Sequence, residues 1–414
     1  MHAPSRNQAT SRAAAVGAAR LALLVALLAL AAALPGATAS TPDWTKAKPE
    51  VVVKDLAMPA DIQVAPDGAI WFVELAGDVS RYDPATGKVA LVRHVDDVVT
   101  GTERGLAGFA LAADFARSGT YFLYYTERND DPDGATNHLV RVDGDKVTVL
   151  LTVTGHKEHN GGRIAVDKDG NLFVGIGENQ KRDPAQDMSS NLGKILHMTP
   201  DGKPVAGNMQ GLIYSKGHRN PYGLAIHPTT GEPWETENSG WRRDEINIIK
   251  PGGNYGYPEC EGLGLNGVST PCPTDKGYTF PVRTFYEDHT AAPTGVTFWR
   301  GEFYWASLNE GSIHHLWQDP ATQAWEDKNV FDPKGMPILD LAVGTHDELY
   351  FSTMDSIQRI TLPNEDVKQT GDAAPLGTGG ATQGSSSKGA SAPAMAAVLA
   401  VLAVGLVARR ARLA

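Results

Sequence analysis

The chain has 414 residues, 42% of them hydrophobic, and a formal net charge of -11. The cationic residues are partly concentrated in the two termini, so the central part is clearly acidic, which argues against nucleic acid as a partner. Two cysteines are too few for a structural zinc site. Between the terminal segments lie about 320 residues without an internal linker, which favours one large repetitive domain over two.

The N-terminal segment, residues 1–39, is predicted to be a signal peptide. Three arginines precede an apolar run over residues 21–34, and Ala37-Thr38-Ala39 offers the small residues of a cleavage site. We therefore expect an exported chain that begins near Ser40.

The C-terminal segment is predicted to tether the chain to a membrane. Residues 363–391 include a long Gly-, Ala-, Ser- and Thr-rich stretch typical of a flexible linker. The apolar run over 392–408 is near the lower limit of the roughly 17 to 25 residues of a spanning helix, and the arginine-rich tail 409–414 is typical of a cytoplasmic flank. The alternative is a disordered tail. If the C-terminal segment is a membrane anchor, the central domain is expected on the extracytoplasmic cell surface, with this tail as its only membrane contact.

Short segments of alternating apolar character recur along the central part. Turn residues such as Asp67-Gly68 and Asp169-Gly170 separate the two strands of a pair, as in β-hairpins. Six repeats indicate an all-β, six-bladed β-propeller over residues 45–362, with a β-sandwich as the structural alternative. The repeated segments are 61–64 with 70–73, 108–111 with 121–124, 163–166 with 171–174, 223–226, 295–298 with 303–305, and 340–343 with 349–351.

The two cysteines, Cys260 and Cys272, enclose a short loop rich in Gly and Pro. In an exported protein such a pair is predicted to form one disulfide. The alternative is a pair of free thiols.

Polar side chains gather in three segments between the predicted strands. They are His159-Asn160-Gly161-Gly162-Arg163, Gly217-His218-Arg219-Asn220-Pro221 and Asp244-Glu245-Ile246-Asn247. Charged and amide groups beside glycines and prolines, on loops carried by a rigid sheet scaffold, indicate a chemical site.

Several motifs follow one another in the order seen in the glucose/sorbosone dehydrogenase family. They are Glu178-Asn179-Gln180-Lys181-Arg182, Ala185-Gln186-Asp187, Leu192-Gly193-Lys194-Ile195-Leu196, the segment 217–221 and Gly253-Asn254-Tyr255-Gly256-Tyr257-Pro258. The chain resembles the soluble six-bladed aldose sugar dehydrogenases of this family from about Asp61 to Leu362. The resemblance implies pyrroloquinoline quinone (PQQ) and Ca2+ as cofactors. It also implies oxidation of an aldose at its anomeric carbon to a lactone, and an external electron acceptor.

The resemblance gives His159 the role of catalytic base and Arg219 and Asn220 the binding of PQQ. A neutral imidazole accepts a hydroxyl proton near pH 7, and an arginine stabilises negative charge that grows on quinone oxygens. Arg219 is therefore expected to act in catalysis as well as in binding. The alternatives are a turn histidine with satisfied hydrogen bonds and an arginine that only supports the loop before Pro221.

The resemblance also implies two calcium positions. One corresponds to Glu245 and Tyr255, and the other to main-chain oxygens of Ser239 and Gly240, which agrees with the preference of Ca2+ for oxygen ligands. The alternative for the carboxylates of this loop is a solvated acidic pair.

The chain departs from the family where cations are expected. PQQ carries several carboxylates, so its pocket should supply cations or many hydrogen-bond donors. The family has a lysine in the fifth blade, where this chain has Asn309, and arginines in the sixth, where it has Pro337 and Leu339. A glutamine near the funnel corresponds to Glu103, which we assign to the cofactor site.

The calcium loop departs as well. Ser239-Gly240 stands where the family has Gly-Pro, and Arg242 and Arg243 stand where it has two glycines. We predict that Arg242, Arg243 or Arg104 compensates for the missing cations and binds the cofactor carboxylates. The alternative is a non-catalytic surface propeller that has lost PQQ and binds carbohydrate or protein. An exposed cluster of Trp241 with Tyr257 would favour carbohydrate, whereas buried rings would belong to the core. The tryptophans considered for such a contact are Trp234, Trp241, Trp299, Trp305, Trp317 and Trp325.

Overall fold

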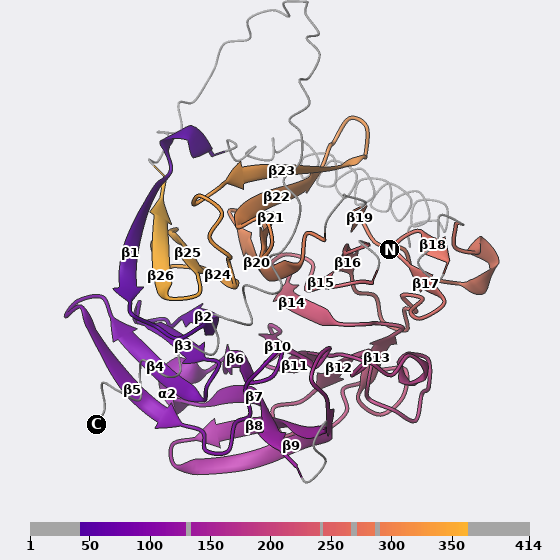
Figure 1. Cartoon of the computed structure of the whole chain (residues 1–414), viewed down its shortest axis with the longest axis horizontal. Coiled ribbons are helices and arrows are strands. Elements are labelled where there is room, and N and C mark those ends of the chain that lie inside the picture. Colours follow the sequence, from indigo (N-terminus) through magenta and orange to yellow (C-terminus); the bar gives the residue numbers. More distant parts are fainter. Residues whose placement is uncertain (1–41, 130–133, 241–242, 266–270, 286–289, 363–414) are drawn as a thin grey trace, which may run out of the picture. The chain divides into compact units, whose positions relative to one another are not determined.

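Six four-stranded antiparallel sheets build the chain from Lys48 to Thr361, and each sheet is one blade of a propeller (Figure 1). The computed structural model describes residues 42–129, 134–240, 243–265, 271–285 and 290–362. The predicted segments 1–39, 363–391, 392–408 and 409–414 lie outside these ranges. Within them, no helix is long and apolar enough to span a bilayer. The prediction of an all-β six-bladed propeller is confirmed.

The blades follow one another in chain order. Blades 1 to 3 consist of β2 (Pro59–Val64), β3 (Ile70–Glu74), β4 (Asp78–Asp83) and β5 (Lys88–His94); β6 (Leu106–Leu111), β7 (Tyr121–Arg128), β8 (Ala135–Asp143) and β9 (Lys146–Gly155); and β10 (Gly161–Val166), β11 (Leu172–Ile176), β12 (Lys194–Met198) and β13 (Ile213–Lys216). Blades 4 to 6 consist of β14 (Pro221–Ile226), β15 (Pro233–Glu237), β16 (Glu245–Ile248) and β19 (Arg283–Thr284); β20 (Pro293–Trp299), β21 (Glu302–Ser307), β22 (Ser312–Gln318) and β23 (Trp325–Phe331); and β24 (Asp340–Val343), β25 (Leu349–Ser352), β26 (Ser356–Thr361) and β1 (Lys48–Lys54).

A few short elements join the blades. The hairpin of β17 (Cys260–Glu261) and β18 (Gly264–Leu265) follows β16. The Cys260–Cys272 disulfide links this hairpin to the loop behind it, with a Cα–Cα distance of 5.7 Å, so the predicted pairing is confirmed. The helical turns are η1 (Trp44–Lys46), α2 (Phe115–Ser118), η2 (Asp183–Ala185) and η3 (Thr274–Lys276).

The propeller closes through pairing between the two ends of the described chain. β1 pairs antiparallel with β26 from Lys48 opposite Thr361 to Lys54 opposite Ser356. The innermost strands β2, β6, β10, β14, β20 and β24 contact one another in a ring, and β24 returns to β2. Contact within this ring protects the inner edge of each blade.

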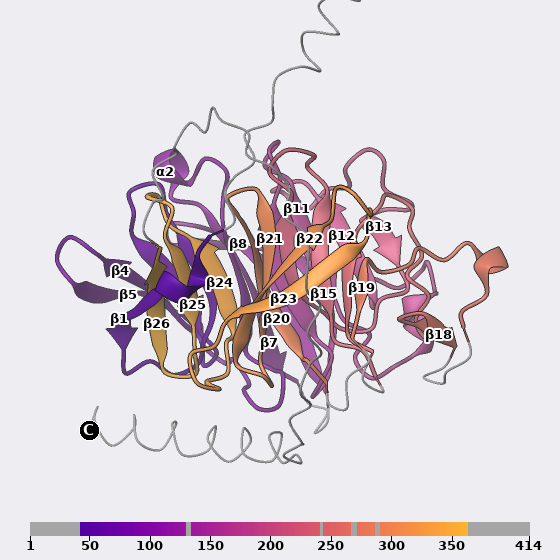
Figure 2. The same ribbon diagram turned by 90° about the horizontal axis from the view of Figure 1, so that it is seen from above.

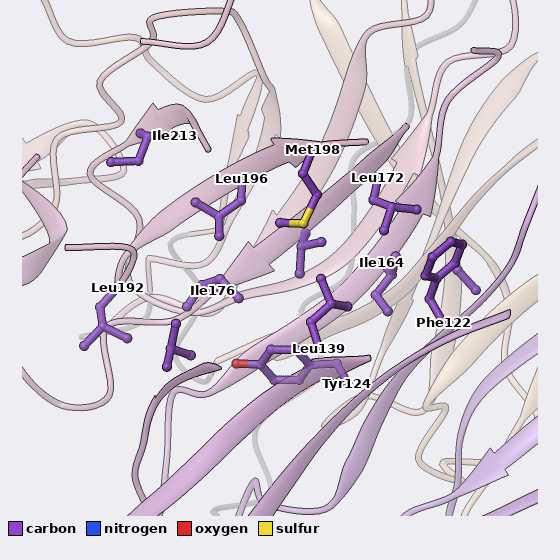
Figure 3. Packing of buried hydrophobic residues seen from close by; sticks show 13 residues of the cluster. Phe122, Tyr124, Leu139, Ile164, Leu172, Ile176, Leu192, Leu196, Met198 and Ile213 are labelled. Carbon is purple, nitrogen blue, oxygen red and sulfur yellow. The ribbon is translucent and has the colours of Figure 1, made fainter. Parts of the chain in front are cut away.

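Alternating side chains along each strand fill the spaces between blades. In β7, Phe122 and Tyr124 pack with blade 3 in the cluster of Figure 3, whereas Tyr121 and Leu123 belong to a cluster with residues of blade 1. Side chains on the two faces of a strand point in opposite directions, so one strand serves two interfaces. Burial of each large apolar side chain contributes about 1.5–3 kcal/mol.

Loops that precede the innermost strands share one face of the propeller. α2 follows β6 and lies on the upper face in Figure 2, so the segment that precedes β6 lies on the opposite face. Glu103, His159 and Arg219 each lie just before an innermost strand, β6, β10 and β14 respectively. The scaffold therefore brings the predicted site residues to a common face.

A buried arginine connects three innermost strands across the central channel. Arg163 Nη1 lies 2.7 Å from Asp61 Oδ2 and 3.4 Å from Asp340 Oδ2, and Nη2 donates to the main-chain oxygens of Ala60 and Leu339. The three charged residues line a cavity of about 250 Å³. Burial raises the pKa of Asp340 to about 8, with Arg163 opposing the shift and Asp61 adding to it.

Replacing this carboxyl should change how stability depends on pH. The folded-state pKa of Asp340 is raised, so its contribution to stability is complete below about pH 4 and is lost as the pH rises through about 8. We expect D340N to flatten the fall of the unfolding free energy between about pH 5 and 8, by up to about 1.4 kcal/mol per pH unit. Urea denaturation measures both slopes, and D96N, at an exposed turn, controls for the loss of one negative charge. Equal slopes in wild type and D340N would contradict this assignment.

Candidate active site

Glu103 joins the loops of three blades into one site. Its Oε2 accepts hydrogen bonds from the main-chain N–H of His159 at 2.7 Å and from Asn220 Nδ2 at 3.1 Å. Asn220 Oδ1 in turn accepts from the N–H of Gly161 at 3.3 Å. The structure therefore brings together Glu103, His159 and Asn220. Glu103 Oε2 is already hydrogen-bonded to the other two residues.

His159 is oriented by a carboxylate to which the sequence analysis assigned no role. His159 Nδ1 lies 2.6 Å from Glu178 Oε1, and both residues are buried. Because a carboxylate only accepts, Nδ1 carries the proton and Nε2 is left as a proton acceptor. Glu178 is the second residue after β11 and lies beside the loop of His159 in the same blade. That position was the signal that sequence reasoning missed.

The backbone around His159 leaves no room for a side chain at residue 177. A Cβ at Gly177 would lie 2.0 Å from the main-chain oxygen of His159, so only glycine fits there. His159 has a φ of 59°, and its oxygen accepts from the N–H of Asn179 at 3.1 Å. The N–H of Glu178 donates to the oxygen of Arg219 at 2.8 Å, which ties the histidine loop to the arginine loop.

Arg219 and Asn220 share one buried acceptor. The main-chain N–H groups of both residues donate to Glu237 Oε1, that of Asn220 at 2.8 Å. The half-buried guanidinium of Arg219 donates through Nη1 to the oxygen of Asn238. Glu237 thus fixes the backbone from which the predicted cofactor-binding side chains project.

A buried histidine holds Glu237 in turn. His218 Nδ1 lies 3.1 Å from Glu235 Oε1 and 3.0 Å from Glu237 Oε2, while Nε2 lies 2.8 Å from Ser215 Oγ. Burial opposes a charge on His218, but Glu235 and Glu237 outweigh it and raise its pKa to about 9. These three residues have ligand atoms within 4.8 Å of one another. Without a metal, the His218 Nδ1–H group lies between the two carboxylates, so hydrogen bonds to both of them hold the cluster together.

The predicted calcium loop is held by Asp244. The N–H of Ser239 donates to Asp244 Oδ1 at 3.0 Å, and the N–H of Ala292 donates to Oδ2 at 2.8 Å. Burial raises the pKa of Asp244 to about 6. Among the described residues, the main-chain oxygens of Ser239 and Gly240 accept no hydrogen bond, and such uncommitted oxygens fit a calcium ion.

Glu245 and Tyr255 differ in what they offer a metal. The Glu245 carboxylate accepts from the N–H of Gly262 and from Asn247 Nδ2, and burial followed by the charge of Glu237 raises its pKa to about 8. A divalent ion would offset this repulsion. The Tyr255 hydroxyl donates to the oxygen of Ile248 and accepts from the N–H of Lys250. Only the main-chain oxygen of Tyr255 is therefore suited to a metal.

The predicted compensating arginines are placed unequally. Arg242 lies outside the described residues. Arg243 is buried, and its Nη1 lies 3.4 Å from the main-chain oxygen of Glu261. Asn309 and Leu339 are uncharged, so these positions supply no cation. The Asn309 amide donates to the main-chain oxygen and the Oγ1 of Thr290, and Leu339 is buried. Arg219, Arg182 and Arg243 all lie close enough to Glu261 to act on its charge, so this side of the face does carry cations.

Several aromatic rings that sequence reasoning considered for a binding surface belong to the core. Trp234, Trp299 and Trp305 are buried, and Tyr257 is also buried, with its hydroxyl 3.4 Å from Glu178 Oε1. Trp241 lies outside the described residues. For the buried rings, packing rather than ligand contact explains their presence.

Comparison with known proteins identifies the family. The sequence matches the family described as Glucose / Sorbosone dehydrogenase over residues 56–362. Aldose sugar dehydrogenase YliI of Escherichia coli strain K12 is 30% identical over 339 residues, which cover 74% of this chain and 90% of that protein. Quinoprotein glucose dehydrogenase B of Acinetobacter calcoaceticus is 28% identical over 289 residues, or 59% of this chain and 60% of that protein. The PQQ-bound structure of aldose sugar dehydrogenase from Streptomyces coelicolor is 28% identical, with a TM-score of 0.65, and the match covers 77% of this chain and 99% of that one. The chain belongs to the glucose/sorbosone dehydrogenase family.

Proposed function

We propose that this protein oxidises aldose sugars at the anomeric carbon to lactones, with PQQ and Ca2+ as cofactors and an external electron acceptor. The observation that carries the proposal is the His159–Glu178 pair beside the Arg219–Asn220 loop. Relatives named aldose sugar dehydrogenase and quinoprotein glucose dehydrogenase support the substrate class and the cofactor.

His159 is the proposed base. Its Nε2 takes the proton of the anomeric hydroxyl as the C1–H bond breaks and the C1–O bond becomes a carbonyl. Glu178 accepts from Nδ1 and stabilises the imidazolium that results. When bound, PQQ supplies the acceptor for the hydride that leaves C1.

Arg219 and Asn220 are the proposed cofactor-binding residues. The guanidinium of Arg219 would stabilise the negative charge that grows on the quinone oxygens as the cofactor is reduced. Glu237 fixes the backbone of Arg219 before any ligand binds. Glu103 keeps the Asn220 amide and the His159 backbone in one arrangement. Ser239, Gly240, Glu245 and the main chain of Tyr255 are the proposed sources of calcium ligands.

The cellular location is proposed from the termini. Residues 1–39 have the pattern of a signal peptide, and 392–414 have that of an anchor with a basic flank. The Cys260–Cys272 disulfide agrees with an exported domain. We place the catalytic domain on the extracytoplasmic surface, where electrons pass to an external acceptor.

A second candidate function rests on the cations that the chain lacks. Asn309, Pro337 and Leu339 supply no positive charge opposite Arg219. A propeller without PQQ would remain a surface module that binds carbohydrate or protein.

Reconstitution separates the two candidates. The purified full chain, titrated with PQQ and Ca2+, should reduce an artificial dye when aldoses are added, because His159 Nε2 and Arg219 are available on one face. Equilibrium binding of PQQ should saturate under the same conditions. Absence of both dye reduction and PQQ binding would reject the enzyme and favour the binding module.

Removing the base should separate chemistry from binding. We expect H159A to lower kcat by roughly 10²- to 10⁴-fold, the usual contribution of a general base, with PQQ affinity nearly unchanged. Steady-state kinetics and a PQQ titration give the two values. H346A is the matched control, because His346 is exposed in a turn of blade 6. Full activity of H159A would remove His159 as the base.

Glu178 should act through His159 rather than on the substrate. E178Q keeps the shape of the side chain, but a neutral amide stabilises the imidazolium less well, so we expect kcat to fall roughly 10- to 100-fold. The sugar KM should change little. The acidic limb of the kcat–pH profile should also move in E178Q, and an unchanged profile would leave Glu178 a purely structural role.

A further inference from the structure

Glu261 extends from the disulfide-linked hairpin toward the Ser239–Gly240 loop. It ends β17, where it pairs with Gly264, and its neighbour Cys260 forms the disulfide with Cys272. Both carboxylate oxygens of Glu261 lie within 3.5 Å of the point that a Cβ on Gly240 would occupy. Arg219 Nε lies 3.8 Å from the same point. Glu261 therefore faces the loop that is proposed to hold the cofactor calcium.

Three oxygens around this loop have no hydrogen-bond partner in the described part of the chain. Glu261 is only 7% exposed, yet its Oε2 has no hydrogen-bond partner in the described part of the chain. The main-chain oxygens of Ser239 and Gly240 are also unused there. Buried polar oxygens of this kind are costly unless a ligand or ion satisfies them.

We propose that Glu261 is a calcium ligand, acting together with the main-chain oxygens of Ser239 and Gly240. The inference rests on the calcium site of the proposed function and adds to it a carboxylate from a separate, disulfide-linked element. Ca2+ prefers six to eight oxygens in a flexible shell, and its affinity rises with the number of charged ligands. A protein carboxylate lets the loop bind calcium before the cofactor arrives.

The position of residue 240 places the Glu261 carboxylate and Arg219 around the same point. A Cβ at Gly240 would be in van der Waals contact with both carboxylate oxygens, at 3.4 and 3.5 Å. Burial raises the pKa of Glu261 even though the charges of Arg219, Arg182 and Arg243 act on it, so a further cation would stabilise the ionised carboxylate.

Calcium titration of the apoprotein tests the inference without PQQ. We expect E261Q to weaken Ca2+ binding to the chelator-treated full chain by about tenfold or more, measured by calorimetry. E259Q is the matched control, because Glu259 is exposed on the same segment and pairs with the Tyr278 hydroxyl. E245Q, measured in parallel, identifies any binding event that belongs to the other predicted calcium position.

The outcomes are distinguishable. Equal Ca2+ affinity in E261Q and wild type overturns the inference. If PQQ also binds more tightly to E261Q, Glu261 competes with the cofactor for Arg219 instead of binding calcium. The unfolding temperature of E261Q without calcium shows that the variant is folded. If calcium binding depends on Glu261 but PQQ never binds, the proposed function fails and the calcium inference stands.

Discussion

The buried carboxylate of Glu237 is the constraint on which the site depends. It accepts the N–H groups of both Arg219 and Asn220, and the charge of His218 compensates its own. From that point the contacts form a closed path, because the oxygen of Arg219 accepts from the N–H of Glu178, Glu178 holds His159, and Glu103 links His159 back to Asn220. The proposed base, His159, and the neighbouring Arg219 are fixed in this way, so they would need little reorganisation as charge develops, which is the physical basis of electrostatic catalysis.

The propeller makes such a path possible because it fixes the loops from outside. The innermost strands form a ring, β1 closes blade 6 by pairing with β26, and Arg163 ties the centre to Asp61 and Asp340. Buried ion pairs of this kind add little net stability, since desolvation offsets attraction, but loss of one partner is costly. Their effect here is on geometry, because they hold neighbouring blades in register beneath the site.

Much of this arrangement follows from local sequence, and the rest requires closure of the ring. Repeated strand pairs and Asp-Gly turns predict the blades, and the exported character predicts the disulfide. The position of His159 in its motif indicates a base. Glu178 offers only its position after β11 as a signal, and Glu237 offers none, because their contacts with His159 and with the Arg219–Asn220 backbone form only in three dimensions. Tyr255 shows that a motif residue can be unavailable to a ligand. Its hydroxyl is already hydrogen-bonded to the main chain of Ile248 and Lys250, and the motif does not reveal these bonds.

The distribution of charge around the face determines how an anionic cofactor is held. Asn309, Pro337 and Leu339 leave the fifth and sixth blades without cations at the positions where the family resemblance expects them, while Arg219 and Arg243 lie on the side of blade 4. That same side carries the buried carboxylates Glu235, Glu237, Glu245 and Glu261. Burial raises the pKa of Glu245 and Glu261, so the cluster resists full ionisation in the absence of a counter-ion. A divalent cation on the Ser239–Gly240 loop would therefore favour the ionised form of Glu261, its proposed ligand. It would also restore positive potential on the side that is proposed to hold the cofactor.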